Sequence, residues 1–273
     1  PEDDFLISKI KNKIATITLN RPQKKNALTL EMLVTLSTIG DNLKDETSLK
    51  CIIIKGSAGT FSSGIDITSF ASLASDKQLL NSIMAPLDGV SYNQIQKSCL
   101  IWQEISIPVV AVLEGPVFGA GLQLALGADI RIAGDNTVLS IMETKWGLIP
   151  DMGITQTLPK LISYDQALYA TLTSNLITAT EAKSLGLVTI CSKNPYDEST
   201  KWVKGISTRS PEAIVSTKTL YKKAWSEKTT DNVRLEALLQ TKLIGSPNQM
   251  EAVLANIENR TPNFVPIEQT NEQ

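Results

Sequence analysis

LEGPVFGAGLQLALGADIRIAG, residues 113–134, contains the signals of a strand, a glycine turn, a short helix and a second strand in immediate succession. Gly115 and Pro116 end the first strand, and Gly119-Ala120-Gly121 opens a helix of small residues. Small side chains permit close packing of a helix on a sheet. The start of such a helix also offers unpaired backbone N–H groups to an atom that develops negative charge. Taken alone, the stretch is compatible with both interpretations.

Strand and helix signals continue to alternate on both sides of this stretch. Leucine and isoleucine recur at helical spacing over residues 30–43 behind Thr29, which we expect to cap the helix. Short β-branched runs bounded by Gly, Pro, Asn or Asp are IATITLN (14–20), CIIIKG (51–56), IPVVAVLEG (107–115), ADIRIAG (128–134) and TVLSI (137–141). The alternation predicts an α/β fold with a largely parallel sheet buried by helices.

The strand signal stops near residue 197. Helical patterns follow at 211–226, 230–245 and 247–258. We therefore expect a β/α core over residues 1–195 and a helical C-terminal region over residues 196–273.

Composition excludes several classes of function. The 273 residues include 26 basic and 28 acidic ones, for a net charge of −2, and the isoelectric point is near 5.4. Nucleic-acid binding is disfavoured because it requires a clustered basic surface. No apolar run approaches the roughly 18 residues of a membrane helix. The three cysteines are widely spaced, as in intracellular proteins with reduced thiols, so we expect a cytoplasmic location.

The chain contains no histidine. This excludes Ser-His-Asp and Cys-His nucleophile activation and every zinc site that uses imidazole, and we expect no metal. Proton transfer near neutral pH must therefore use carboxylates, lysines, tyrosines or cysteines with shifted pKa values.

The stretch METKWGLIPDMG (142–153) places Glu143 and Asp151 eight positions apart. Its glycines and proline argue against a regular helix, so the spacing alone does not place the two side chains. Acids are usually solvated on a surface. The apolar residues of this stretch would instead raise a carboxyl pKa and keep the group protonated near pH 7.

The loop GTFSSGIDITSF (59–70) follows the strand CIIIKG directly, and Gly59 and Gly64 permit a turn with an exposed backbone. Its N–H groups could donate to an oxyanion. Taken alone, a simple connection is the preferred interpretation.

Together and in this order, the motifs resemble those of the enoyl-CoA hydratase/isomerase family, the crotonases. They are LNRPQKKNAL (19–28), FSSGIDI (61–67), EGPVFGAGLQLALGADIRIA (114–133) and GLIPDMGITQTLPKLI (147–162), and the resemblance extends to NRTPNFVP (259–266). It implies a spiral of ββα units with a helical C-terminal trimerisation region, in a homotrimer or a dimer of trimers. The implied substrate is an acyl-CoA thioester, with no cofactor besides the coenzyme A that is part of the substrate.

The resemblance also implies a shared mechanism in which two backbone N–H groups stabilise a thioester enolate. By motif these belong to Ile65 and Ala120. The CoA moiety would lie along Ser63–Ile67, and Lys24 or Lys25 would bind its phosphates. The predicted substrate contacts are Lys25, Ser63, Gly64, Asp66, Ile67, Gly121, Gln123 and Trp146.

The side-chain acids distinguish family members. Typical hydratases carry a glutamate where this chain has Gln123, and an amide cannot act as a general acid or base. The pair Glu143 and Asp151 resembles the dienoyl-CoA isomerases, although these carry a further aspartate at the position of Gln123. We prefer the isomerase type, with Asp151 as the base and protonated Glu143 as the acid. The alternatives are an enoyl-CoA hydratase that uses Glu143, and a non-catalytic acyl-CoA-binding member of the fold.

Overall fold

The computed structural model describes residues 5–44, 46, 48–226 and 246–266. Its main sheet has the order β1-β2-β3-β4-β6-β9, in which β1 is antiparallel to β2 and the other neighbours are parallel. The bounds are β1 Leu6–Lys11, β2 Ile14–Leu19, β3 Cys51–Gly56, β4 Val109–Leu113, β6 Ile130–Ala133 and β9 Ile190–Cys191. The predicted α/β class and largely parallel sheet are confirmed.

A second sheet contains β5 (Pro116–Phe118), β7 (Val138–Ser140) and β8 (Ile177–Thr178). β5 follows β4 after two residues and pairs in parallel with β7. The chain therefore passes from one sheet to the other immediately before the glycine turn at residues 119–121.

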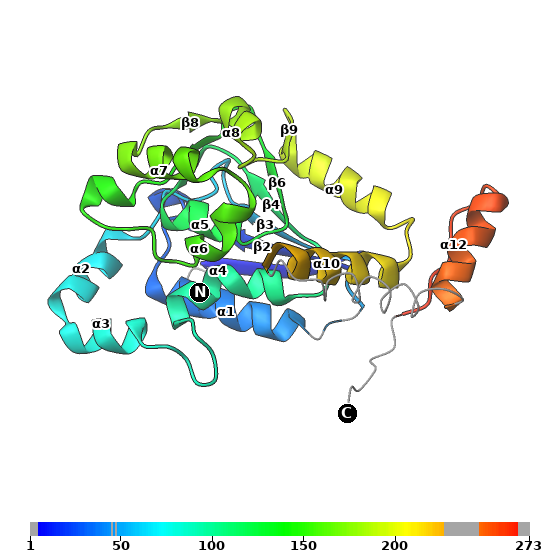
Figure 1. The fold of residues 1–273 in the computed structure, drawn as a ribbon, viewed down its shortest axis with the longest axis horizontal. Helices are drawn as coiled ribbons and strands as arrows, with labels where there is room; N and C mark the ends of the chain where they lie inside the picture. Colours follow the sequence, from blue (N-terminus) through cyan, green and yellow to red (C-terminus); the bar gives the residue numbers. More distant parts are fainter. Residues whose placement is uncertain (1–4, 45, 47, 227–245, 267–273) are drawn as a thin grey trace.

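Helices cover both sheets and extend the molecule at its C-terminal end (Figure 1). They are η1 Pro22–Lys24, α1 Leu30–Lys44, α2 Ile67–Ser75, α3 Lys77–Met84, α4 Gln94–Glu104, α5 Ala120–Leu126, η2 Glu143–Trp146, α6 Ile154–Thr157, η3 Leu158–Lys160, α7 Tyr164–Thr173, α8 Ala179–Leu185, α9 Pro195–Ile206, α10 Pro211–Ser226 and α12 Pro247–Ile257. Helix α12 lies at one end of the molecule, and α2 and α3 lie at the other.

Most of the predicted elements are found within a few residues of their expected bounds. Thr29 caps α1 as expected, since its hydroxyl accepts a hydrogen bond from the Met32 amide at 3.1 Å. Helices α10 and α12 match the patterns at 211–226 and 247–258, whereas the pattern at 230–245 lies outside the described residues.

Strand β1 was missed because its hairpin signal is weak. Its turn residues Asn12 and Lys13 both have positive φ (53° and 63°), as a type I′ turn requires, but lysine stands where glycine is usual. The strand also carries two lysines, which suits an edge strand but obscures its apolar pattern.

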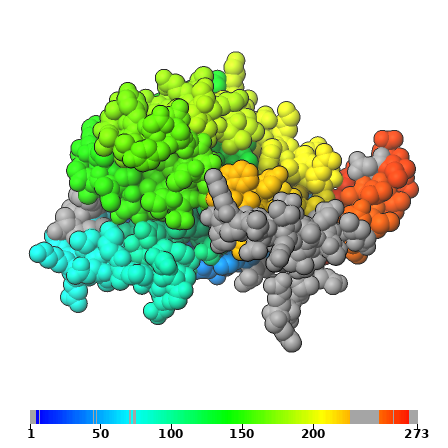
Figure 2. All heavy atoms as spheres, in the orientation of Figure 1, coloured from blue at the N-terminus to red at the C-terminus, as the bar shows by residue number. Residues whose placement is uncertain are grey.

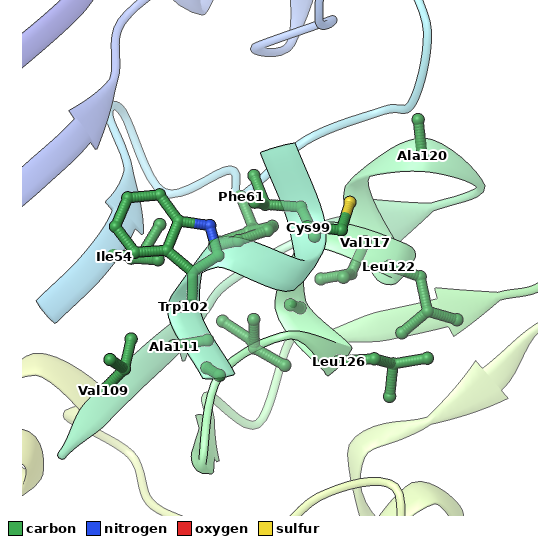
Figure 3. Close-up of a cluster of buried hydrophobic side chains, with 14 of the residues drawn as sticks. Ile54, Phe61, Cys99, Trp102, Val109, Ala111, Val117, Ala120, Leu122 and Leu126 are labelled. Carbon is green, nitrogen blue, oxygen red and sulfur yellow. The ribbon is translucent and has the colours of Figure 1, made fainter. Parts of the chain in front are cut away.

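Helix α5 is packed into the centre of the main core. All seven of its residues are buried. Figure 3 shows Leu122 and Leu126 in the same cluster as Phe61, Cys99 and Trp102, with Ala120 at the far end of the helix. Because the helix is fixed on several sides, its first residue is held at a defined place.

Candidate active site

The loop from Phe61 to Asp66 is hydrogen-bonded on both of its edges. Ser62 pairs with β5: its amide donates to Pro116 O at 3.0 Å, and Phe118 N donates to Ser62 O at 3.1 Å. Farther along, Leu28 N donates to Gly64 O and Asp66 N to Leu28 O, both at 2.8 Å. In this parallel bridge the N–H of Ile65 is directed away from Leu28. It donates to no described residue, so it is available to a ligand.

The start of α5 lies against this loop. A Cβ atom added at Gly121 would stand 2.7 Å from Ser62 Cβ, and one added at Gly64 would stand 3.1 Å from Phe118 O. Gly119 precedes the helix with φ of +48°, and its amide donates to Ser140 O at 3.0 Å. The next amide, that of Ala120, is in the first turn, where an intrahelical acceptor is lacking. The structure thus brings the segments of the two predicted donors together.

Arg21 and Asn26 fix the loop and its flanking residues through side-chain hydrogen bonds. Neither residue was predicted from the sequence as part of the site. Arg21 Nη1 donates to Asp66 Oδ2 at 3.0 Å and to Ala27 O at 2.7 Å. Asn26 is fully buried, and its Nδ2 donates to Ser57 O at 3.1 Å and Thr60 O at 2.6 Å. Its φ of +54° is in the left-handed region, which asparagine adopts more readily than most residues. Their place in the motif LNRPQKKNAL was the available signal, because both residues lie inside it.

Asp66 has structural partners that occupy its carboxylate. Besides the ion pair with Arg21, Oδ1 accepts hydrogen bonds from the amide and the hydroxyl of Thr68 and caps α2. These hydrogen bonds, those from Thr68 first, lower the pKa of Asp66 to about 2. Asp66 remains charged at neutral pH, and its carboxylate fixes the loop that presents Ile65.

The two lysines of RPQKKN lie beside the outer end of the same loop. Ser63 N donates to Lys25 O at 3.0 Å, and the Ser63 hydroxyl donates to Lys24 O at 3.4 Å. Both lysine side chains are exposed. The backbones of two exposed lysines therefore adjoin Ser63.

Glu143 lies next to the turn that precedes Ala120. A Cβ atom added at Gly119 would stand 3.3 Å from Glu143 Oε1. That oxygen accepts a hydrogen bond from Gln123 Nε2 at 2.7 Å, whereas Oε2 is buried and has no partner among the described residues. Burial raises the pKa of Glu143, the charge of Asp151 adds to the rise, and the hydrogen bond from Gln123 opposes it. Glu143 thus combines a raised pKa with a free carboxyl oxygen.

Asp151 is more accessible than Glu143, and its residue as a whole is exposed. The protein around its carboxyl group nevertheless raises the pKa of Asp151 through desolvation. Its backbone is held from two sides: Gln96 Nε2 of α4 donates to Asp151 O at 3.2 Å, and the adjoining Met152 N donates to Gln123 Oε1 at 2.7 Å. The two acids are close enough for their charges to interact.

Two predicted substrate contacts have exposed side chains at the surface. Ile67 is 82% exposed at the start of α2, and Trp146 is 68% exposed at the end of η2. As expected, the segment between the acids is not one regular helix: η2 ends at Trp146, and the capping residue Gly147 has a φ of +72°.

A separate cavity of about 670 Å³ lies elsewhere, between α9, α10 and the ends of β4 and β6. None of the predicted site residues lines it.

Within the described ranges, no group of three or more Cys, Asp or Glu side chains could hold a metal ion. No helix in these ranges is both long and apolar enough to cross a membrane. The predicted site is therefore the surface region formed by the loop 61–66, the start of α5 and the segment 143–151.

Known proteins share both the sequence pattern and the fold. The chain is 32% identical over 263 residues to the putative enoyl-CoA hydratase/isomerase YngF of Bacillus subtilis, covering 94% of this chain and 96% of that protein. It is 27% identical to the peroxisomal Delta(3,5)-Delta(2,4)-dienoyl-CoA isomerase of Arabidopsis thaliana, covering 91% of each. An enoyl-CoA hydratase structure from Bacillus anthracis superposes with a TM-score of 0.86 over 96% of this chain and 99% of that one, at 24% identity.

The enoyl-CoA hydratase/isomerase family model matches residues 9–266, which is nearly the whole chain. The family match, the sequence similarity to YngF and the shared fold agree with one another. The chain belongs to the enoyl-CoA hydratase/isomerase family of acyl-CoA enzymes.

Proposed function

We propose that this enzyme moves a double bond in an unsaturated acyl-CoA thioester, in the manner of a dienoyl-CoA isomerase. The observation that carries the proposal is the acid pair. Glu143 and Asp151 both have raised pKa values and interact electrostatically. Glu143 lies beside the turn at Gly119, and its buried Oε2 has no partner among the described residues. The third polar side chain, Gln123, is an amide and cannot exchange a proton.

In the proposed reaction, Asp151 accepts a proton from the remote carbon of the diene. The electrons of that C–H bond shift along the conjugated system to the thioester oxygen, which becomes an enolate. The N–H groups of Ile65 and Ala120 donate to this oxygen. When the enolate collapses, Glu143 transfers a proton from Oε2 to the α-carbon. One proton is lost and one gained, so the product is an isomer, and the reverse reaction exchanges the roles of the two acids.

Hydration of an enoyl-CoA by Glu143 is the second candidate, and the different exposure of the acids favours it. Asp151 is exposed, whereas Glu143 is half-buried and adjoins the start of α5, the helix that carries one of the proposed oxyanion donors. Hydration normally benefits from a second proton-exchanging group. General acid–base assistance contributes roughly 10²- to 10⁴-fold.

The deciding experiment is incubation with a panel of CoA thioesters, namely 2-trans-enoyl, 3-enoyl, 2,4-dienoyl and 3,5-dienoyl chains. The step above consumes the 2,4-dienoyl chain, and its reverse consumes the 3,5-dienoyl chain. Diene formation is followed by ultraviolet absorbance and water addition by mass spectrometry. We expect migration of the double bond in the dienoyl substrate and slow hydration of the 2-trans-enoyl substrate. Efficient hydration without isomerisation would establish the second candidate.

We also propose that the chain assembles as a homotrimer or a dimer of trimers. Apolar side chains are exposed on α7 and α12: Tyr164, Leu168, Tyr169, Leu172, Met250, Val253, Leu254 and Ile257. Exposed apolar groups on two separate elements suit a head-to-tail contact between copies, which closes into a ring. Figure 2 shows the green region that includes α7 and the red α12 well apart on the surface. Light scattering of the wild type and of Leu172→Glu tests this, and a monomeric wild type would refute it.

A further inference from the structure

The side chain of Gln123 joins Glu143 and the residue after Asp151 to one helix. Gln123 is 2% exposed and lies one turn into α5, the helix that begins with Ala120. Its Nε2 donates to Glu143 Oε1, and its Oε1 accepts from the amide of Met152, the residue after Asp151, both at 2.7 Å. One buried amide thus ties the oxyanion-donor helix, the acid and the segment of the base together.

The orientation of this amide is determined by its partners. A backbone N–H is a donor only, so the atom that faces Met152 must be the acceptor Oε1. This places the donor Nε2 against Glu143. Because Oε1 of Glu143 accepts that hydrogen bond and a carbonyl oxygen is a better acceptor than a hydroxyl oxygen, the proton of a neutral Glu143 is favoured on Oε2. Oε2 is the oxygen that is buried and has no partner among the described residues.

We infer that Gln123 is a positioning residue: it decides which oxygen of Glu143 carries the exchangeable proton, and it holds the Asp151 segment in register with the oxyanion donors. This inference rests on the proposed function and deepens it. A glutamate at this position would face Glu143 with a second acid. Because an amide does not exchange protons, Glu143 is the proton-exchanging member of this pair, and its proton is on Oε2.

Two variants separate the effects of the two hydrogen bonds. Gln123→Met keeps the length of the side chain and removes both. Gln123→Glu keeps an acceptor for the Met152 amide but replaces the donor that faces Glu143. Gln156→Met is the matched control, because Gln156 is exposed on the neighbouring helix α6.

The first measurement is the titration of Glu143 in substrate-free enzyme. It uses infrared spectroscopy with ¹³C-labelled glutamate, and the band is assigned by its loss in Glu143→Gln. The hydrogen bond from Gln123 lowers the pKa of Glu143, so Gln123→Met should move the titration to higher pH. In Gln123→Glu the two carboxyl groups should titrate as a coupled pair, in two widely separated steps. The control should titrate like the wild type.

The second measurement is steady-state kinetics. In Gln123→Met we expect kcat to fall roughly 100-fold through loss of positioning, with KM within about threefold of the wild type. The alkaline limb of the pH profile should move upward with the titration of Glu143. An unchanged Glu143 titration and unchanged kcat would overturn the inference. If Gln123→Met does not fold, Gln123→Glu supplies the test. Two carboxyl groups that titrate independently, each with the usual pKa of a glutamate, would then overturn the inference.

The titration needs no substrate, so it distinguishes the two possible failures. If no thioester is isomerised or hydrated by the wild type, the proposed function fails while the titration still tests Gln123. If turnover is normal in Gln123→Met and the pKa of Glu143 does not shift, the proposed function is retained and the proposed role of Gln123 is refuted.

Discussion

The segment that offers the backbone donors is buried and cross-linked, whereas the segment that carries the acids is largely exposed. Phe61 and Ser62 are fully buried, and Asp66 is 6% exposed and paired with Arg21. By contrast, Trp146 is 68% and Ile149 is 75% exposed. The donors are part of the core, and their position depends on the fold itself. The two acids flank an exposed stretch whose side chains contribute little to the core, so substitutions in that stretch should leave the oxyanion site in place.

The largest effect is expected in the exposed segment, where the proposed proton transfer occurs. Glu143→Gln keeps an oxygen that can accept from Gln123 but cannot exchange a proton. Turnover of the dienoyl substrate should fall roughly 10²- to 10⁴-fold. Affinity for the CoA thioester, measured by calorimetry, should change little because the group acts on a moving proton.

Asp151→Asn is the companion variant. It should cause a similar loss if Asp151 is the base. Full activity in this variant would leave Glu143 as the working acid and favour hydration over isomerisation.

A somewhat smaller effect is expected when a donor is removed from the buried segment. Ile65→Pro deletes the N–H group, and loss of one oxyanion donor costs roughly 10²- to 10³-fold in kcat. Ile65→Val keeps the N–H group and serves as the control. Equal losses in the two variants would show that the N–H of Ile65 is not a donor to the enolate.

Stability should show the opposite contrast between the two segments. Asn26→Ala removes the four hydrogen bonds of this buried side chain and places alanine at φ of +54°, so we expect a loss of about 2–4 kcal/mol in the free energy of unfolding. Ile149→Ser in the exposed segment should stay within about 0.5 kcal/mol of the wild type. Urea unfolding measures both. Similar losses would contradict the distinction between a core-held loop and a variable one.

The smallest effect concerns pH. Burial raises the pKa of Glu143, so the fold favours its neutral form. That contribution is present below the pKa of the unfolded chain and is lost as pH rises through the raised pKa of the folded state. At pH 8 Glu143→Gln should therefore be more stable than the wild type, by less than about 1 kcal/mol, and near pH 4 the two should agree. Thermal melting at both pH values tests this, and a variant that is less stable at pH 8 would contradict it.

Much of this protein follows from local sequence. The β-branched runs, Thr29 and the glycines at 119 and 121 predicted the strands of the core, the start of α1 and the turn before α5. Each of these signals acts over a few residues, through strand and helix periodicity, capping or backbone freedom. The absence of histidine removes imidazole from any proton transfer, whatever the fold, and Glu143 and Asp151 are acids wherever packing places them.

Other features depend on contacts between distant segments, and only the tertiary structure shows them. Gln123 and Glu143 are 20 positions apart, Gln123 and Met152 are 29 apart, and Arg21 and Asp66 are 45 apart. Nothing in the local pattern distinguishes a substrate-binding Asp66 from one that caps α2, or a free amide from one that clamps an acid. A polar side chain acquires its role from the donors and acceptors that packing brings within about 3 Å of it, and this packing is a property of the whole fold.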